Sequence, residues 1–165
     1  MVKDVNKEVT VGNLLSKYSD VEICDLIDVL QEYRKQKTEL GIPISIFSNP
    51  ELGILESAVK FLKENHSMSY AAIAKALNRD QRTIWCSYHS ANNKEPSRLP
   101  VHKTTYLIPI LVISERKFGP LEALVVFLRD NQKLRFTEIS HILRRDYATI
   151  WRTYRNTRNT RGQDV

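Results

Sequence analysis

Four arginines near the C-terminal end of the chain recur at every third position; they are Arg152, Arg155, Arg158 and Arg161. Residues three apart are neighbours on a helix surface, so their guanidinium groups would form a cationic stripe. Such a stripe can lie along phosphate groups, because Arg and Lys gain free energy when they displace the counterions that surround a polyanion. The alternative is a solvated helix end, since the helix dipole favours cations near the C-terminus.

The arginine stripe belongs to the second copy of an internal repeat. A shift of 66 residues, from Ile42 to Ile108, aligns residues 42–88 with residues 108–154 without a gap. By count, about 19 of the 47 aligned positions are identical. A match of this length at a fixed shift indicates a duplication. The block Arg79, Asp80, Thr83, Ile84, Trp85 and Tyr88 recurs as Arg145, Asp146, Thr149, Ile150, Trp151 and Tyr154.

Each copy begins with the pattern of two short helices. In the second copy, Pro120 follows Gly119 and suits the first position of a helix, where its missing N–H costs nothing. Apolar residues then recur at the i, i+3, i+4 and i+7 spacing of an amphipathic helix. A second helix is predicted over residues 69–77 and 135–143. The two apolar stripes of the first helices are Leu55, Ala58, Val59 and Leu62, and Leu121, Leu124, Val125 and Leu128.

A polar break and a third helix follow in each copy. Asp80 and Asp146 suit the cap of that helix, because a carboxylate accepts hydrogen bonds from the unpaired N–H groups of the first turn. Ile84 and Tyr88 then share one helix face. The predicted fold class is therefore mainly all-α, with two tandem trihelical units, an N-terminal amphipathic helix and two short strands.

The two copies share a motif over the second and third helices. It consists of the Ile73-Ala74 pair, Leu77, the capping residue Asp80 and the Thr83-Ile84 pair. The segment SYAAIAKALNRDQRTIWCSYHSA resembles the helix-turn-helix of sigma-factor region 4 and related trihelical DNA-binding domains. The segment FTEISHILRRDYATIWRTYRNT repeats the pattern with Ser140 in place of Ala74. Asn78 and Arg144 stand where such turns often have glycine, which tolerates a left-handed backbone.

The resemblance implies that each third helix enters the major groove and that its N-terminal residues contact base edges. Gln81 and Arg82 have the donor geometry for base recognition, so we expect the first copy to recognise sequence. The second copy looks better suited to holding phosphates through Arg152 and Arg155. The expected DNA-binding residues are Gln81, Arg82, Trp85, His89, Arg144, Arg145, Tyr147, Arg152, Arg155 and Arg158; Cys86 and Ala148 are further outward positions.

Two repeated features have structural alternatives. Trp85 and Trp151 lie three residues before a tyrosine, so both aromatics could close the trihelical core against the first helix. A partner interface or a nucleic-acid contact is the other interpretation of the tryptophans. The repeated Arg-Asp pair before the third helix can be explained by capping and a local ion pair without any function.

The remaining segments suggest a domain organisation. Ser19 and Glu22 have capping-box spacing and open an amphipathic helix to about Lys37, within an N-terminal segment of residues 1–41. This helix is predicted to pack on the first repeat or, alternatively, to form a homodimer. The apolar stretches 42–47 and 107–113 could pair as short strands. Ser90 to Tyr106 holds two prolines and is predicted as a linker. The predicted domains are repeat 1 over 42–92, the domain linker over 93–106, and repeat 2 with a basic C-terminal tail over 107–165.

Composition excludes several classes of protein. The net charge is +6, and residues 96–165 carry thirteen Lys/Arg against six Asp/Glu, which favours a polyanionic partner. No apolar run approaches the roughly 20 residues of a membrane span, and the first ten residues lack the apolar core of a signal peptide, so we expect a cytoplasmic protein. Cys24 and Cys86 form no recognisable pair. There is no glycine loop for phosphates and no metal-ligand spacing, so we expect no enzyme, cofactor or metal.

Two hypotheses about function follow from these patterns. The first is a small transcriptional regulator that binds double-stranded DNA through both units. The second is an adaptor or scaffold whose helix-turn-helix units bind protein through Trp85 and Trp151. Polar outward faces on the third helices favour DNA, whereas apolar outward faces favour a protein partner. A mixed case, in which only the second copy binds nucleic acid, is also compatible with the charges.

Overall fold

The computed structural model describes residue 19 and residues 22–29, 40–102 and 106–162, with side chains up to residue 159. Within these residues the chain is mainly helical and contains one small antiparallel sheet of two strands. Chain contacts divide it into two units, Met1–Gln36 and Lys37–Val165, and each is described by itself. No helix in the part of the chain described is long and apolar enough to cross a membrane.

The first unit contains a short helix over residues 22–29. The backbone N–H of Ser19 donates to the Glu22 carboxylate (2.8 Å), and the N–H of Glu22 donates to Ser19 Oγ (3.4 Å), which confirms the capping box. Leu26, Ile27 and Val29 are exposed on this helix. The rest of the helix predicted to Lys37 lies outside the described residues.

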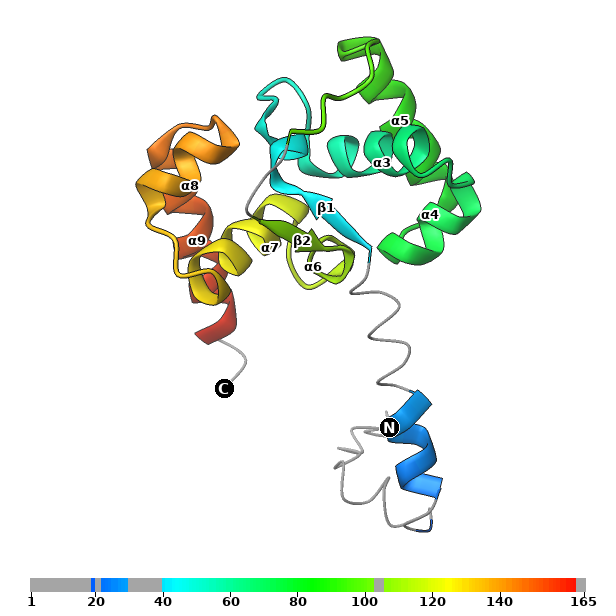
Figure 1. The fold of residues 1–165 in the computed structure, drawn as a ribbon. Coiled ribbons are helices and arrows are strands. Elements are labelled where there is room, and N and C mark those ends of the chain that lie inside the picture. The colour runs from blue at the N-terminus through cyan, green and yellow to red at the C-terminus, as the bar shows by residue number, and fades with distance from the viewer. Residues whose placement is uncertain (1–18, 20–21, 30–39, 103–105, 163–165) are drawn as a thin grey trace, which may run out of the picture. The chain divides into compact units, whose positions relative to one another are not determined.

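The second unit contains two successive sets of elements in the same order (Figure 1). The first set is β1 (Gly41–Pro43), the 3-10 turn η1 (Ile44–Ser48), α3 (Ile54–Asn65), α4 (Tyr70–Leu77) and α5 (Gln81–Lys94). The second set is β2 (Leu107–Pro109), α6 (Ile110–Ser114), α7 (Pro120–Val126) with its π-helical continuation η2 (Phe127–Asn131), α8 (Phe136–Leu143) and α9 (Tyr147–Gly162).

The three longer helices of each set close around the predicted apolar stripes. Most of the stripe residues of α3 and α7 are fully buried, as are the branched residues of the second and third helices. The bounds of α4 and α8 confirm the predicted second helices to within one residue. Burial of this kind contributes roughly 1.5–3 kcal/mol per large aliphatic side chain. The buried set is Ala58, Val59, Leu62, Ile73, Leu77 and Ile84, and Leu124, Val125, Leu128, Ile139, Leu143 and Ile150.

Three boundary predictions were wrong in part. The apolar stretches 42–47 and 107–113 pair as strands only over their first residues, because the chain turns into η1 and α6 after Pro43 and Pro109. Helix α5 continues to Lys94, so the predicted linker begins after this residue rather than at Ser90. The basic segment at the C-terminal end is helical to Gly162 rather than a tail.

The two sets are related by a local two-fold axis. In the β1–β2 ladder, Ile42 pairs with Ile108, its own equivalent in the repeat, and Gly41 pairs with Pro109 as Pro43 pairs with Leu107. If the two copies are exchanged, each residue pair of the ladder is replaced by another pair of the same ladder. This is the property of an isologous contact, in which two equivalent surfaces meet across a two-fold axis. The same exchange relates two further contacts. Helix α4 packs on α6 and α8 packs on η1, and in the repeat α4 is equivalent to α8 and α6 to η1.

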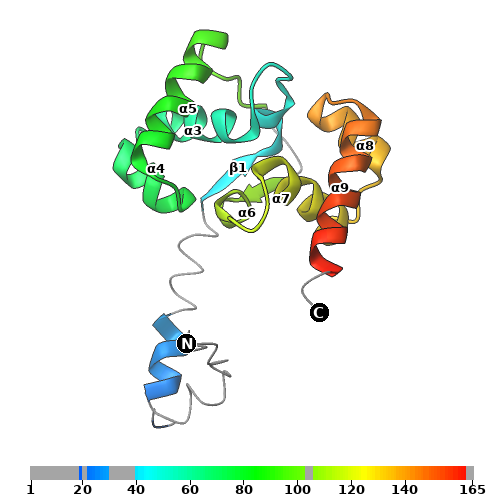
Figure 2. The same cartoon turned by 180° about the vertical axis from the view of Figure 1, so that it is seen from behind.

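The two copies also share one core. Buried side chains from both sets, including Phe47 and Leu52 of the first and Ile110 and Ile113 of the second, form one continuous hydrophobic cluster. Each copy therefore completes the apolar surface of the other. Figures 1 and 2 show α5 and α9 on opposite sides of the β1–β2 pair, running in opposite directions.

Candidate nucleic-acid interface

Helices α5 and α9 each begin after a three-residue connection with a left-handed turn. Asn78 and Arg144 end the preceding helices at φ 51° and φ 48°. Asn adopts this conformation readily, whereas Arg does so at a cost. Asp80 Oδ1 then accepts the N–H of Arg82 (2.8 Å), and Asp146 Oδ2 accepts the N–H of Thr149 (3.1 Å). The predicted capping role of both aspartates is confirmed.

The outward face of α5 is polar with one large aromatic. Gln81 and Arg82 are exposed in the first turn, and His89 is exposed two turns later. Trp85 lies between them with 49% of its surface exposed, and Cys86 is exposed beside it. The structure therefore brings the candidate base-reading residues and the tryptophan onto one accessible helix.

The outward face of α9 is cationic. Arg152, Arg155 and Arg158 are exposed, and no acidic residue occurs from Tyr147 to Asn159. Tyr147 begins the helix with 47% of its surface exposed. The side chain of Arg161, the fourth member of the predicted stripe, lies outside the described residues. The described arginines form a positive surface that no carboxylate of α9 itself neutralises after its capping residue.

The expectation that both tryptophans close the core was wrong. Trp151 is 42% exposed and Trp85 is 49% exposed, and in each copy the partly buried aromatic is the tyrosine three residues later. A three-residue step rotates a side chain by about 60° around a helix, so the Tyr turns inward while the Trp stays outside. The core position therefore belongs to Tyr88 and Tyr154.

Each exposed tryptophan carries a stacked side chain from the position four residues later. The His89 ring lies 3.9 Å from the Trp85 ring, between centroids, and its Nδ1 is 2.9 Å from the Trp85 carbonyl oxygen. In the second copy, the guanidinium carbon of Arg155 lies 5.2 Å from the centroid of Trp151. Stacking on an aromatic face holds a cation in place while its outer N–H groups stay available.

The tyrosines anchor the third helices to the first helices. Tyr88 donates to Glu64 Oε1 (3.3 Å) and Tyr154 donates to Asp130 Oδ1 (2.8 Å). Burial, followed by the neighbouring carboxylate, raises the pKa of both phenols above the usual value of 10.0. Each phenol therefore stays neutral and keeps donating at physiological pH.

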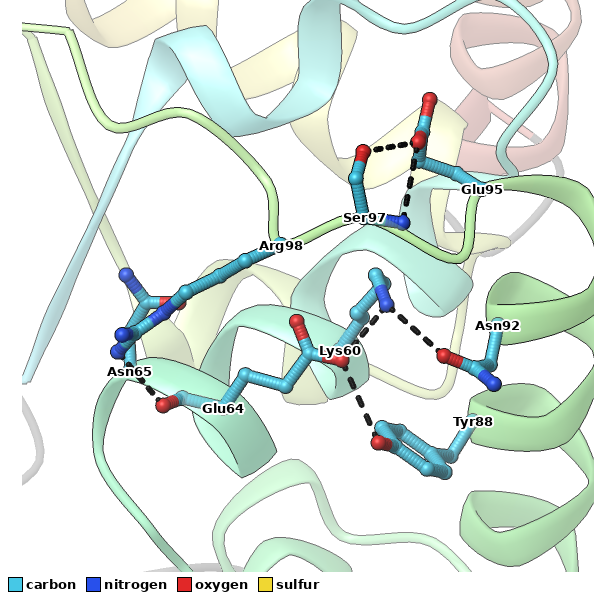
Figure 3. Close-up of polar contacts among 8 residues, drawn as sticks. All are labelled: Lys60, Glu64, Asn65, Tyr88, Asn92, Glu95, Ser97 and Arg98. Atoms are coloured by element: carbon cyan, nitrogen blue, oxygen red, sulfur yellow. Dashed lines mark hydrogen bonds and ion pairs between the residues drawn. The ribbon is translucent and has the colours of Figure 1, made fainter.

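In the first copy the anchor extends into a polar network (Figure 3). The buried ammonium group of Lys60 donates to Glu64 Oε1 (2.6 Å) and to Asn92 Oδ1 (3.3 Å). Arg98 reaches the carbonyl oxygen of Glu64 from the segment after α5 (2.7 Å). Val126 occupies the position of Lys60 in the second copy, so the repeat does not require this charge. The network ties α5 and the following segment to α3.

The arginine of the repeated Arg-Asp pair serves the contact between the copies. Arg145 is half-buried and donates from Nη2 to the carbonyl oxygen of Leu52 (2.8 Å). Its equivalent Arg79 donates to the carbonyl oxygen of Glu115 (3.2 Å). Among the predicted DNA-binding residues, Arg145 is therefore turned toward the other copy, whereas Arg144 is exposed beside it.

Sequence reasoning missed a basic pocket between the copies. Arg79, Arg116 and Lys117 line a cavity of about 460 Å³ together with Asp80 and neighbouring residues. Burial and then the charge of Arg116 lower the pKa of the Arg79 guanidinium. The symmetry-related position beside Arg145 lacks these two cations, because the first copy has Pro50 and Glu51 where the second has Arg116 and Lys117. Only the tertiary contact of the two copies brings these cations together.

Comparison with protein-family models, curated proteins and solved structures found no match. The interpretation of the surface therefore rests on its own side chains. Within the repeat, most of the identical pairs are buried or cap a helix, which folding explains. Thr83 with Thr149 and Trp85 with Trp151 are different, because both pairs are identical and exposed on the third helices. Packing in the core and helix capping do not explain these two exposed identities.

Proposed function

We propose that the chain binds double-stranded DNA through the outward faces of α5 and α9, used as the third helices of two helix-turn-helix units. The observation that carries the proposal is the exposed run of Arg152, Arg155 and Arg158 on α9, a helix without an acidic residue after Asp146. Such a run attracts a polyanion more strongly than a mixed-charge surface does, because each arginine that meets a phosphate releases counterions. A small transcriptional regulator is the role that this binding mode supports best.

The connection between the second and third helices supports the same proposal. A three-residue connection with a left-handed first residue is the layout of a helix-turn-helix, and it leaves the N-terminal turn of the third helix free to approach a groove. Gln81 and Arg82 occupy that turn in the first copy and are exposed. We assign base contacts to these two residues and phosphate contacts to Arg152 and Arg155.

One observation favours a second candidate function, a protein adaptor. Trp85, Tyr147 and Trp151 are exposed large hydrophobic side chains on the third helices, and exposed aromatic residues are common in protein interfaces. In DNA binding, the same rings pack against sugars and position the stacked His89 and Arg155. The two functions differ in their salt dependence, because phosphate contacts release counterions and aromatic contacts do not.

The test uses the full chain and a labelled random duplex, with binding followed by fluorescence anisotropy at two salt concentrations. We expect binding at low salt that weakens steeply as salt rises. The Arg152→Ala, Arg155→Ala double variant should bind at least about tenfold more weakly and show a log–log salt slope smaller by about two, since each phosphate contact contributes about 0.9 to that slope.

The matched control is the Lys75→Ala, Lys133→Ala double variant. It also removes two exposed cations but changes neither α5 nor α9. We expect this variant to keep most of the affinity and most of the salt slope. Absence of binding at low salt would overturn the DNA proposal and leave the adaptor as the better supported function. Equal losses in the two double variants would show that net charge, rather than α9, drives binding.

A further inference from the structure

The local two-fold axis restricts which DNA sequences can occupy both third helices. The axis passes between Ile42 and Ile108, which are paired in the β1–β2 ladder and equivalent in the repeat. It also relates the packing of α4 on α6 with the packing of α8 on η1. In addition, the equivalent arginines Arg79 and Arg145 each donate to a backbone carbonyl of the other copy, although the two acceptors, Glu115 and Leu52, are not equivalent positions. The relation therefore extends from the strands to the second helix of each copy, which directly precedes the turn and the third helix.

Helices α5 and α9 follow this relation. They lie on opposite sides of the strand pair and run in opposite directions (Figures 1 and 2). Duplex DNA has its own local two-fold axes, perpendicular to the helix axis, which relate one strand to the other. When the two-fold axis of the protein coincides with one of the DNA, the two third helices meet equivalent positions in the groove. The sequence that one helix contacts on one strand then recurs on the opposite strand under the other helix.

A tandem repeat with a free linker would behave differently. Copies related by translation along the duplex favour a direct repeat, because each then meets the same strand in the same direction. Here the shared core and the crossed arginine bonds join the two copies, so their relative orientation is part of the fold. The orientation of the half-sites is therefore a property of the structure rather than of the linker.

The two halves must also differ in sequence. At the N-terminal turn of the third helix, Gln81 and Arg82 of α5 stand where α9 has Tyr147 and Ala148. Gln and Arg can donate to base edges in the major groove, whereas Ala offers only an apolar contact, such as that with a thymine methyl group. The identical Thr83 and Thr149 offer the same contact in each half. The expected half-sites are therefore related but unequal.

We infer that the DNA ligand of this chain is an imperfect inverted repeat, with one half bound by α5 and the other by α9. This inference rests on the proposed function, and the experiment below distinguishes failure of the inference from failure of DNA binding itself. It adds two claims that DNA binding alone does not require: the half-sites are inverted relative to each other, and their sequences differ.

The experiment begins with selection of bound duplexes from a random library by the full chain. The selected sequence is then compared with a duplex in which one half is reversed to give a direct repeat, and with duplexes that carry only one half. We expect an inverted repeat with unequal halves, and at least about tenfold weaker binding when one half is reversed, since the reversed half loses its base contacts.

A double variant tests the inequality of the halves. Gln81→Tyr with Arg82→Ala gives α5 the first-turn residues of α9, at positions that are exposed and outside the core. Selection with this variant should yield a more symmetric site, in which both halves resemble the half that α9 binds. Retention of the original unequal site would contradict the assignment of the halves to the two helices.

The outcomes separate the inference from the proposed function. Binding to duplex DNA with no preference for the inverted over the direct arrangement overturns the inference and leaves DNA binding standing. Equal affinity for a single half-site and for the full site also overturns it, because one helix would then account for the binding. Absence of binding to any duplex overturns the proposed function itself, and the inference falls with it.

Discussion

Arg145 of the second copy donates a hydrogen bond of 2.8 Å to the carbonyl oxygen of Leu52 in the first copy. The arginine is one of the residues that the sequence predicted to bind DNA, yet its side chain lies in the contact between the copies. A half-buried guanidinium that satisfies a distant carbonyl group holds two parts of a fold together. The position of the Arg145 side chain therefore favours a structural role for this arginine over a ligand-binding role.

Arg145→Ala should therefore lower the free energy of unfolding, by about 1–3 kcal/mol, because it leaves the Leu52 carbonyl without its charged donor. Urea denaturation followed by circular dichroism measures this change. Arg152→Ala is the control, since an exposed side chain without such a contact should change stability by about 0.5 kcal/mol or less. Equal stability of the two variants would contradict the structural role of Arg145.

Arg144→Gly should raise the free energy of unfolding by about 1 kcal/mol. Arg144 has φ 48°, and a side chain in this left-handed region costs roughly 1–2 kcal/mol that glycine avoids, although glycine also makes the unfolded chain more flexible. Arg144→Ala is the matched control, because alanine removes the charge but keeps a β-carbon and its strain. Thermal denaturation measures both variants, and a stabilised alanine variant would show that charge rather than backbone geometry is responsible.

Trp85→Ala and Trp151→Ala should each lower the free energy of unfolding by only about 1 kcal/mol, because nearly half of each side chain is exposed and neither belongs to the core cluster. They should nevertheless weaken duplex binding, since they remove the platforms on which His89 and Arg155 stack. Tyr154→Ala, three residues after Trp151, should instead cost about 2 kcal/mol or more through lost packing and a lost bond to Asp130. If the tryptophan variants are as unstable as the tyrosine variant, the exposed placement is wrong.

The two anchoring tyrosines predict a loss of stability at alkaline pH. The pKa of Tyr88 and that of Tyr154 are raised by burial and by a neighbouring carboxylate, so the fold favours the neutral phenol. The stabilisation is complete below the unfolded pKa of 10.0 and is lost as pH rises from there through the folded pKa.

Denaturation at pH values between about 8 and 11 tests this dependence. The Tyr88→Phe, Tyr154→Phe double variant should start from a lower stability, because it lacks the bonds to Glu64 and Asp130, and should lose less as the pH rises. Tyr147→Phe changes an exposed tyrosine and should follow the curve of the unchanged protein. Parallel curves for the double variant and the unchanged protein would contradict the anchoring role of the phenols.

Local patterns in the sequence were sufficient for much of the fold. The stripe from Leu55 to Leu62, the capping residues Asp80 and Asp146, and Pro120 at a helix start each act over one or two helical turns, so neighbouring residues alone predict them. The strand pairing was also predicted, because both apolar stretches are β-branched and stand at equivalent places in the repeat. The duplication itself follows from identity at one fixed shift.

Tertiary structure decided which face of the third helices is exposed and how the copies meet. Trp85 and Tyr88 are both aromatic and only three residues apart, so composition could not show which one packs on α3; the path of that helix decides it. Arg145 and Arg144 are adjacent and chemically identical, and the approach of Leu52 to Arg145 decides which of the two side chains is turned toward the other copy. The two-fold axis depends on the register of Ile42 against Ile108, a long-range pairing that no local pattern specifies.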